Sequence, residues 1–275
     1  MTVKRLFSIF LAVATLGAMA SAQATAPAAP AAMAADPSAQ KARKLLDEMV
    51  AALGGPVWLN YTTRQEEGRS YSFYHGKPTS AGTLFWRFYE YPDKERSELT
   101  KQRDVIEIFN ATKGCEKTYK GAAPVEQKVL DEVVRRHSHS LEVVIRQWLR
   151  DPRTILMYVG QKVADQQLVD VVSILNADND EVSIGIDINS HLPINIQYSW
   201  RDPDKYKVEN EIVFGNYRTV QGIKVPYTIT RKRDGEISGQ NFLNKVEFNP
   251  TFAAGFFDTT VTYDPATYNA HDKKK

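Results

Sequence analysis

Two histidines, His137 and His139, stand one residue apart, a spacing that raises the question of a metal site. On a helix, residues i and i+2 point about 200° apart, so both rings could bind one ion only if the helix broke between them. The other histidines, His75, His191 and His271, fall at expected turns or in the C-terminal tail. We therefore expect no metal site and no cofactor.

Two further patterns have simpler structural explanations. Asn176, Asp178 and Asp180 have the oxygen spacing of a calcium loop, but the glycine and bidentate glutamate of such a loop are missing. A hairpin turn accounts for the same residues. Ser38 and Lys41 match a serine–lysine nucleophile spacing, yet a serine at a helix start is expected as a cap. Neither pattern predicts chemistry.

The single cysteine, Cys115, excludes an internal disulfide and has no histidine partner nearby in the sequence. We expect it to be a small, half-buried strand residue. The chain contains no G-x-S-x-G, no G-x-G-x-x-G and no phosphate-binding P-loop. The sequence therefore nominates no catalytic residue, and a protein that is not an enzyme is expected.

The N-terminus has the three parts of a secretory signal peptide: basic Lys4 and Arg5, an apolar run, and a small-residue cleavage site that ends at Ala22. Gln23 follows, so a lipid-modified cysteine is not expected there. Residues 23–37 form an Ala/Pro-rich linker, and residues 265–275 form a basic tail. We predict cleavage after Ala22 and a soluble periplasmic protein that is not lipid-anchored.

Charge gives no indication of nucleic-acid binding. The chain has 35 basic and 33 acidic residues, and loss of the two basic residues of the signal peptide makes the numbers equal. A neutral protein has no long-range attraction for polyanions. With 43% hydrophobic residues, the chain can bury a substantial core.

Hydrophobic spacing alternates between helical and strand-like periods along the chain. A helix is expected over residues 38–53, with Ser38 as its cap and Gly54-Gly55-Pro56 as its end. Strands are expected over 57–74, 83–91, 96–101, 104–110 and 115–120, and an amphipathic helix over 125–150 that breaks near residues 137–140. From residue 154 onward the pattern alternates as in strands. The apolar stripe of the second helix comprises Leu130, Val133, Val134, Leu141, Val144 and Trp148.

These elements predict a single α+β domain over residues 38–264. About ten or eleven antiparallel strands would form a curved half-barrel, with two or three helices on its concave, apolar face. Two main helices are too few to cover so wide a sheet. Composition alone therefore leaves two alternatives open: the inward-facing apolar residues are either ordinary core or the wall of a ligand-sized apolar cavity. The residues predicted to line it are Leu84, Trp86, Phe88, Ile184, Ile186, Ile196, Tyr198, Trp200, Ile212, Phe214, Val225, Tyr227, Ile229 and Phe242.

Several segments, in this order, resemble a known family. They are the run from Gly82 to Pro92, residues 104–109 followed by Gly114, the helix at 125–149, the run 214–226 and the closing segment 248–258. Together they resemble the LolA/LolB-like periplasmic lipoprotein carriers, which include the outer-membrane lipoprotein-sorting proteins. The likeness covers roughly residues 40–262. Tyr91 stands where the best-known carriers have an arginine that latches the lid, so the resemblance leaves two alternatives: the latch is absent, or Arg87 or Arg96 takes its place.

The resemblance implies a monomeric carrier that shields the acyl chains of lipoproteins, or of another lipid, under a helical lid. It also implies an inner-membrane donor protein, an outer-membrane acceptor protein and release at the outer membrane. The alternative that it implies is an RseB-like lipid-sensing regulatory domain, a class that normally carries a second domain. A third hypothesis is an enzyme acting on a lipid or cell-wall substrate.

Overall fold

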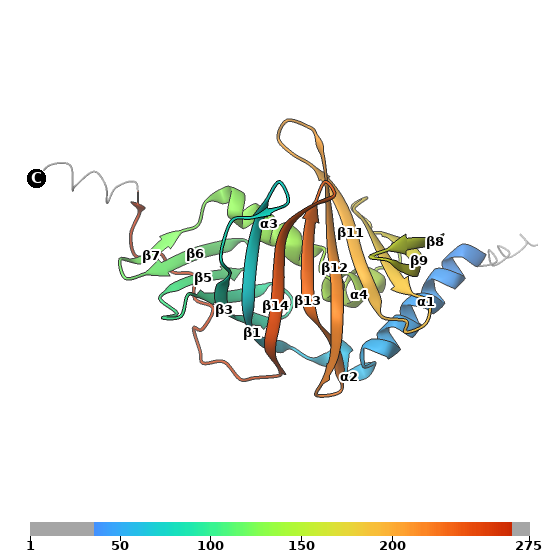
Figure 1. Cartoon of the computed structure of the whole chain (residues 1–275), viewed down its shortest axis with the longest axis horizontal. Helices are drawn as coiled ribbons and strands as arrows, with labels where there is room; N and C mark the ends of the chain where they lie inside the picture. Colours follow the sequence, from blue (N-terminus) through green and yellow to red (C-terminus); the bar gives the residue numbers. More distant parts are fainter. Residues whose placement is uncertain (1–35, 266–275) are drawn as a thin grey trace, which may run out of the picture. The chain divides into compact units, whose positions relative to one another are not determined.

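The computed structural model describes residues 36–265. These residues form one large antiparallel sheet of fourteen strands with helices on one face (Figure 1). The predicted signal peptide, the linker except residues 36 and 37, and the tail after residue 265 lie outside the described residues. The predicted α+β half-barrel is confirmed, with more strands than expected.

The helices and strands have the following bounds. The helices are α1 (Pro37–Leu53), α2 (Pro56–Asn60), α3 (Gln127–Ser138), α4 (Leu141–Arg146) and the short 3-10 helix η1 (Trp148–Arg150). The strands before α3 are β1 (Thr63–Tyr74), β2 (Lys77–Pro78), β3 (Thr83–Glu90), β4 (Lys94–Leu99), β5 (Val105–Asn110), β6 (Lys113–Thr118) and β7 (Gly121–Pro124). Those after η1 are β8 (Ile155–Ala164), β9 (Gln167–Leu175), β10 (Glu181–Asp187), β11 (Pro193–Arg201), β12 (Lys207–Val220), β13 (Ile223–Arg233) and β14 (Glu236–Phe248).

The strand order is β7-β6-β5-β4-β3-β1-β14-β13-β12-β11-β10-β9-β8, with β2 paired to β1. The predicted sequential meander is thus confirmed, and the first and last long strands meet at its centre (Figure 1). The two edge strands, β7 and β8, are consecutive along the chain. The connection that contains α3, α4 and η1 must therefore run from one edge of the sheet to the other.

Two predicted hairpin turns have the expected backbone. Gln221 and Gly222 join β12 to β13 with φ values of 48° and 83°, and Asp234 and Gly235 join β13 to β14 with 50° and 81°. Positive φ at both central residues matches the right-handed twist of the flanking strands. The two turns lie at opposite ends of β13 and form long hairpins with β12 and β14.

The start of the chain differs in detail from the prediction. Residues 56–60 form α2 rather than the beginning of a strand. Asp36, not Ser38, caps α1, because its carboxylate accepts a hydrogen bond from the Ser38 backbone N–H. The Ser38 hydroxyl instead accepts a hydrogen bond from the backbone N–H of Tyr158 at 2.9 Å. Ser38 therefore ties α1 to β8, and Lys41 lies over the ring of Tyr158, 3.6 Å from its centre.

One row of side chains defines the inner face of the sheet. Phe248, Arg64, Tyr89, Glu95 and Phe109 are successive register partners across β14, β1, β3, β4 and β5. Directly paired residues point to the same side of a sheet. Phe248 belongs to the main core together with α1 and α4, and Phe109 packs against α3. All three helices therefore lie on this face.

The main core fills the inner face of the second half of the sheet. It packs the apolar stripe of α1 and the buried residues of α4 against strands β9 to β14. Ile184, Ile196 and Val182 are fully buried there. The period-two apolar pattern correctly predicted that Ile184, Ile196 and Val225 point inward.

The outer face of the first half is also covered, contrary to prediction. Phe88 and Ile108 pack there with the buried Cys115 and with Phe257, from the segment that follows β14. Phe252 stacks on Phe256 in this segment, with ring centres 4.9 Å apart. An apolar face that the sequence assigned to the concave side is thus buried under residues 249–263.

Replacing Phe257 by alanine should lower the free energy of unfolding by about 3–5 kcal/mol, the usual cost of a buried Phe→Ala change. Because Phe257 packs in the same cluster as Cys115, the Cys115 thiol should also react faster with Ellman's reagent. Urea denaturation and thiol-labelling rates measure the two effects. Val261, which is 44% exposed, is the control: Val261→Ala should change stability by less than about 0.5 kcal/mol. Unchanged thiol reactivity in Phe257→Ala would contradict the packing described.

Candidate functional site

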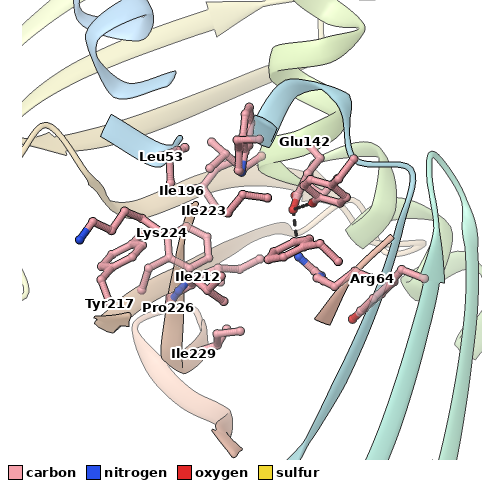
Figure 2. A pocket seen from close by; sticks show the side chains of 18 of the residues that line it. Leu53, Arg64, Glu142, Ile196, Ile212, Tyr217, Ile223, Lys224, Pro226 and Ile229 are labelled. Carbon is pink, nitrogen blue, oxygen red and sulfur yellow. Dashed lines mark hydrogen bonds and ion pairs between the residues drawn. The ribbon is translucent and has the colours of Figure 1, made fainter. Parts of the chain in front are cut away.

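An apolar cavity of about 160 Å³ lies on the inner face between the sheet and α4. Figure 2 shows Leu53, Ile196 and Ile223 on one side of it, with Arg64 and Glu142 on the other. Its apolar lining comprises Leu53, Leu141, Ile196, Ile212, Phe214, Ile223, Val225, Ile229 and Phe248. We call this space the apolar chamber. It is open at one side rather than sealed, and side chains from α1, α4 and strands β11 to β14 build it.

The opposite wall of the apolar chamber is polar. Glu142 on α4 accepts hydrogen bonds from Arg64 at 3.0 Å and from the hydroxyl of Tyr61 at 2.6 Å. Arg64 lies over the ring of Tyr89, 4.4 Å from its centre. These contacts join α4 to β1 and to the end of α2, so they fix one end of the helical segment on the sheet.

A second buried carboxylate, Glu95 on β4, joins the sheet to α3. Its Oε2 accepts a hydrogen bond from Arg136 at 3.0 Å and lies 2.8 Å from Nε2 of His137. Its Oε1 lies 3.4 Å from Nε of Arg87. Arg87 in turn donates to Glu66 at 3.2 Å. The result is a network of alternating charges, largely shielded from water, beneath the last turn of α3.

The network shifts the pKa values of its carboxyls. Burial acts to raise the pKa of Glu95, but Arg136, the His137 hydrogen bond and Arg87 together hold it well below its usual range. The pKa of Glu142 is likewise lowered, because Arg64 and the Tyr61 hydroxyl outweigh burial. Both groups are therefore carboxylates throughout the neutral range, and their ion pairs with the helices and strands persist there.

Five of the fourteen residues predicted to line a cavity do line the apolar chamber: Ile196, Ile212, Phe214, Val225 and Ile229. Ile184, Ile186 and Tyr227 lie in the main core beside it. Tyr198 and Trp200 line a separate, polar cavity described below. Whether any of them contacts lipid stays a prediction.

For four residues the predicted orientation is wrong. Leu84, Trp86 and Phe88 alternate with Phe85 and the inner-face residues of β3, so they lie on the outer face. Phe242 pairs with Arg69 on the outer face and is 39% exposed. A bulge in the pairing of β1 with β14 reverses the alternation between Phe248 and Phe242, so their shared sequence parity was misleading.

The predicted lid forms a broken helical segment, as expected. α3 ends at Ser138 and α4 begins at Leu141, with Ser140 as its cap. The apolar stripe predicted for the lid packs in two separate hydrophobic clusters. Leu130, Val133 and Val134 pack on Phe109, whereas Leu141, Val144 and Trp148 pack on the main core. Only Leu141 of the stripe lines the apolar chamber.

Sequence reasoning missed the residues of the polar wall. Arg64, Glu66, Arg87 and Glu95 sit in strands where alternating charged residues are usually solvated. A second omission is Arg146 on α4, which is 4% exposed and donates to the backbone carbonyl oxygens of Tyr61, at 2.8 Å, and Trp58. Its guanidinium also lies over the ring of Tyr91, 4.9 Å from the centre. Arg146 therefore joins α4 to α2, to the residue that follows α2 and to Tyr91.

The remaining polar patterns serve structure. His137 and His139 have different partners, because His139 Nε2 lies 2.8 Å from Asp180 while His137 contacts Glu95. The Asn176 side-chain oxygen accepts two backbone N–H groups and forms the hairpin turn that was predicted. Within residues 36–265, no three His, Cys, Asp or Glu side chains gather as metal ligands would. None of the helices described has the length and apolar character needed to span a bilayer.

No protein-family model matches the chain, and no curated protein matches it. Solved structures do resemble it. An outer membrane lipoprotein-sorting protein domain from Vibrio parahaemolyticus is 10% identical, with 80% of this chain and 97% of that one covered and a TM-score of 0.51. A DUF1329 family protein from Desulfovibrio piger is 10% identical, with 79% and 97% covered and a TM-score of 0.53. These two likenesses establish that the chain has the fold of a lipoprotein-sorting protein domain, the LolA-like half-barrel that the sequence resemblance predicted.

Replacing Glu95 by glutamine should lower the free energy of unfolding at pH 7 by about 3–5 kcal/mol, because buried cations lose their partner. The pKa of Glu95 is depressed in the folded state. Its contribution is therefore complete above the unfolded pKa of about 4.3 and is lost as the pH falls through the lower folded pKa. The stability difference between wild type and Glu95→Gln should shrink below about pH 4. Urea denaturation across this range measures it.

Glu107 is the matched control, since it lies on the same face of the adjacent strand β5, opposite Ser97. Burial, and then Glu95 and Glu116, raise its pKa. Its charged form is thus disfavoured by folding, and Glu107→Gln should leave stability at pH 7 unchanged or raise it. Equal losses in the two variants would contradict the roles assigned to the two carboxyls.

Proposed function

We propose that this protein is a periplasmic carrier that shields acyl chains of lipoproteins, or of another lipid, in the apolar chamber. The observation that carries the proposal is an apolar cavity, lined by aliphatic and aromatic side chains, on the inner face of the sheet and roofed by a separate helical segment. The fold shared with a lipoprotein-sorting protein domain supports it. No catalytic constellation is needed for this function.

The energetics suit reversible binding of an acyl chain. Each methylene group removed from water contributes about 0.8 kcal/mol, so a single chain supplies ample driving force. The apolar chamber, at about 160 Å³, is smaller than the roughly 300–1,000 Å³ of typical ligand pockets. Uptake therefore requires α4 to move away from the sheet. The free energy of that movement lowers the net affinity, which allows the lipid to be released.

The cellular setting follows from the sequence. The predicted signal peptide, cleaved after Ala22, would deliver a protein without a lipid anchor to the periplasm. There it would act as a monomer, receive cargo from an inner-membrane donor and pass it to an outer-membrane acceptor. Identifying the lipid that co-purifies with the protein from a periplasmic extract, by mass spectrometry, tests this assignment. Repeatedly empty preparations that take up no acyl probe would overturn it.

Filling the apolar chamber should block binding. Ile229 lines the chamber from β13, so Ile229→Trp should weaken the binding of a fluorescent fatty acid by about tenfold or more, the equivalent of an overpacking cost of about 1–3 kcal/mol. Fluorescence titration of the purified protein measures the dissociation constant.

Leu84→Trp provides the control, because Leu84 lies on the outer face of the same sheet. It introduces the same bulk without entering the chamber, and the dissociation constant should stay unchanged. Equal weakening in both variants would indicate a general loss of fold, which circular dichroism would detect. Undiminished binding to a folded Ile229→Trp variant would place the lipid elsewhere.

A further inference from the structure

Arg231 on β13 is a cation without a protein partner on the inner face of the sheet. It pairs in register with Ile212 and Gly239. No hydrogen bond or ion pair joins its guanidinium to another side chain in residues 36–265, and its Nε is buried and unpartnered. Burial, and then the nearby Arg136 and Arg87, lower its pKa to about 10. The group is still a cation at neutral pH, and the nearby carboxylate that acts to raise its pKa, Glu95, is already paired with Arg87, Arg136 and His137.

Three arginines close to Arg231 on the inner face are already paired with carboxylates. Arg64 contacts Glu142, Arg136 contacts Glu95, and Arg87 contacts Glu66 and Glu95. Unlike these three arginines, Arg231 forms no ion pair within residues 36–265. A buried cation without a counter-ion is costly, and such a group is expected where a ligand supplies the missing anion.

Two further buried polar atoms near Arg231 lack partners. Asn210 lies on β12, two residues before the register partner of Arg231, and its Nδ2 makes no hydrogen bond. Asn241, 1% exposed, pairs with Ile229, and its Oδ1 is also unpartnered. Unsatisfied buried groups are uncommon in native proteins. Of the three unpartnered atoms, Nε of Arg231 and Nδ2 of Asn210 carry N–H donors. A ligand oxygen between these two could accept a hydrogen bond from each.

Arg231 stands at the boundary of two cavities. Arg136, Ile212 and Arg231 line both the apolar chamber and a neighbouring space of about 200 Å³, which we call the polar chamber. Asn210 and Arg135 also line the polar chamber. Arg135 lies over the ring of Trp200, 3.5 Å from its centre. The two acidic residues of its lining are Glu132, on the exposed side of α3, and Glu211, which is paired with Lys232 at 3.0 Å.

We propose that Arg231, with Asn210 and Arg136, binds the anionic headgroup of an amphiphile whose acyl chain occupies the apolar chamber. The headgroup would be a carboxylate or a phosphate, both of which accept the forked N–H donors of arginine. This inference rests on the proposed carrier function and defines its ligand class: acidic rather than neutral lipids. The polar chamber gives the headgroup a hydrated space beside the cation.

The test compares two probes with the same chain: dansyl-undecanoic acid and its methyl ester, which lacks the charge. Wild type should bind the acid at least about tenfold more tightly than the ester, the size expected for charge-assisted hydrogen bonds. In Arg231→Met this preference should disappear while the affinity for the ester stays unchanged. Arg69→Gln, on the outer face of β1, removes one arginine elsewhere and should keep the preference. Displacement by dodecanoic acid and by dodecyl phosphate then identifies which headgroup binds better.

A second measurement distinguishes a binding role from a structural one. Because the charge of Arg231 has no partner, Arg231→Met should not lower the thermal unfolding midpoint of the ligand-free protein. A lowered midpoint together with equal loss of both probes would overturn the inference. So would equal affinity of wild type for acid and ester, which would leave the carrier function standing. If wild type bound neither probe, both the carrier function and the headgroup site would be wrong.

Discussion

The order of the strands imposes the constraint on which the rest of the structure depends. β7 and β8 form opposite edges of the sheet, yet they are neighbours along the chain. The segment between them has to cross one face of the sheet, and as α3, α4 and η1 it crosses the inner face, where its apolar side chains pack. A strongly twisted sheet of this width curves, so the crossing segment spans a hollow rather than lying flat. A roof over the inner face therefore follows from topology, and the side chains decide only how tightly it closes.

The inner face is divided by chemistry into two halves, and the roof uses both. In the second half, α1 and α4 pack on aliphatic strands. In the first half, Glu95 on the sheet binds Arg136 and His137 of the roof, and Glu142 of the roof binds Arg64 on the sheet. A buried ion pair adds little stability compared with apolar side chains of the same size, but it demands one geometry. We infer that the polar half fixes the position of the roof, while the apolar half supplies most of the free energy.

Alternation alone predicted much of the second half of the sheet, because Ile184, Ile196 and Ile212 share the apolar inner face of β10 to β12. The same rule failed on β3, where both faces are buried. Trp86 and Phe88 are covered by the chain after β14, a contact between residues about 170 positions apart that no local pattern reveals. The inner side of β3 carries Arg87 instead, whose partners Glu66 and Glu95 come from two other strands. Which charged residues meet in such a network depends on the register between neighbouring strands. That register is known only once the strand pairing is known.

The mixed roof also bears on how a bound lipid could leave. Ion pairs such as Arg64–Glu142 lose little when water replaces the partner, whereas apolar contacts of Leu141 and Val144 are lost outright on opening. An acyl chain in the apolar chamber would restore apolar contact to those same residues. Movement of the roof away from the sheet therefore costs free energy in the empty protein and costs less when an acyl chain fills the apolar chamber. The closed, empty state and the lipid-bound state then differ by only a small free energy. A carrier requires this balance, because a chamber that stayed open would bind lipid too tightly to release it.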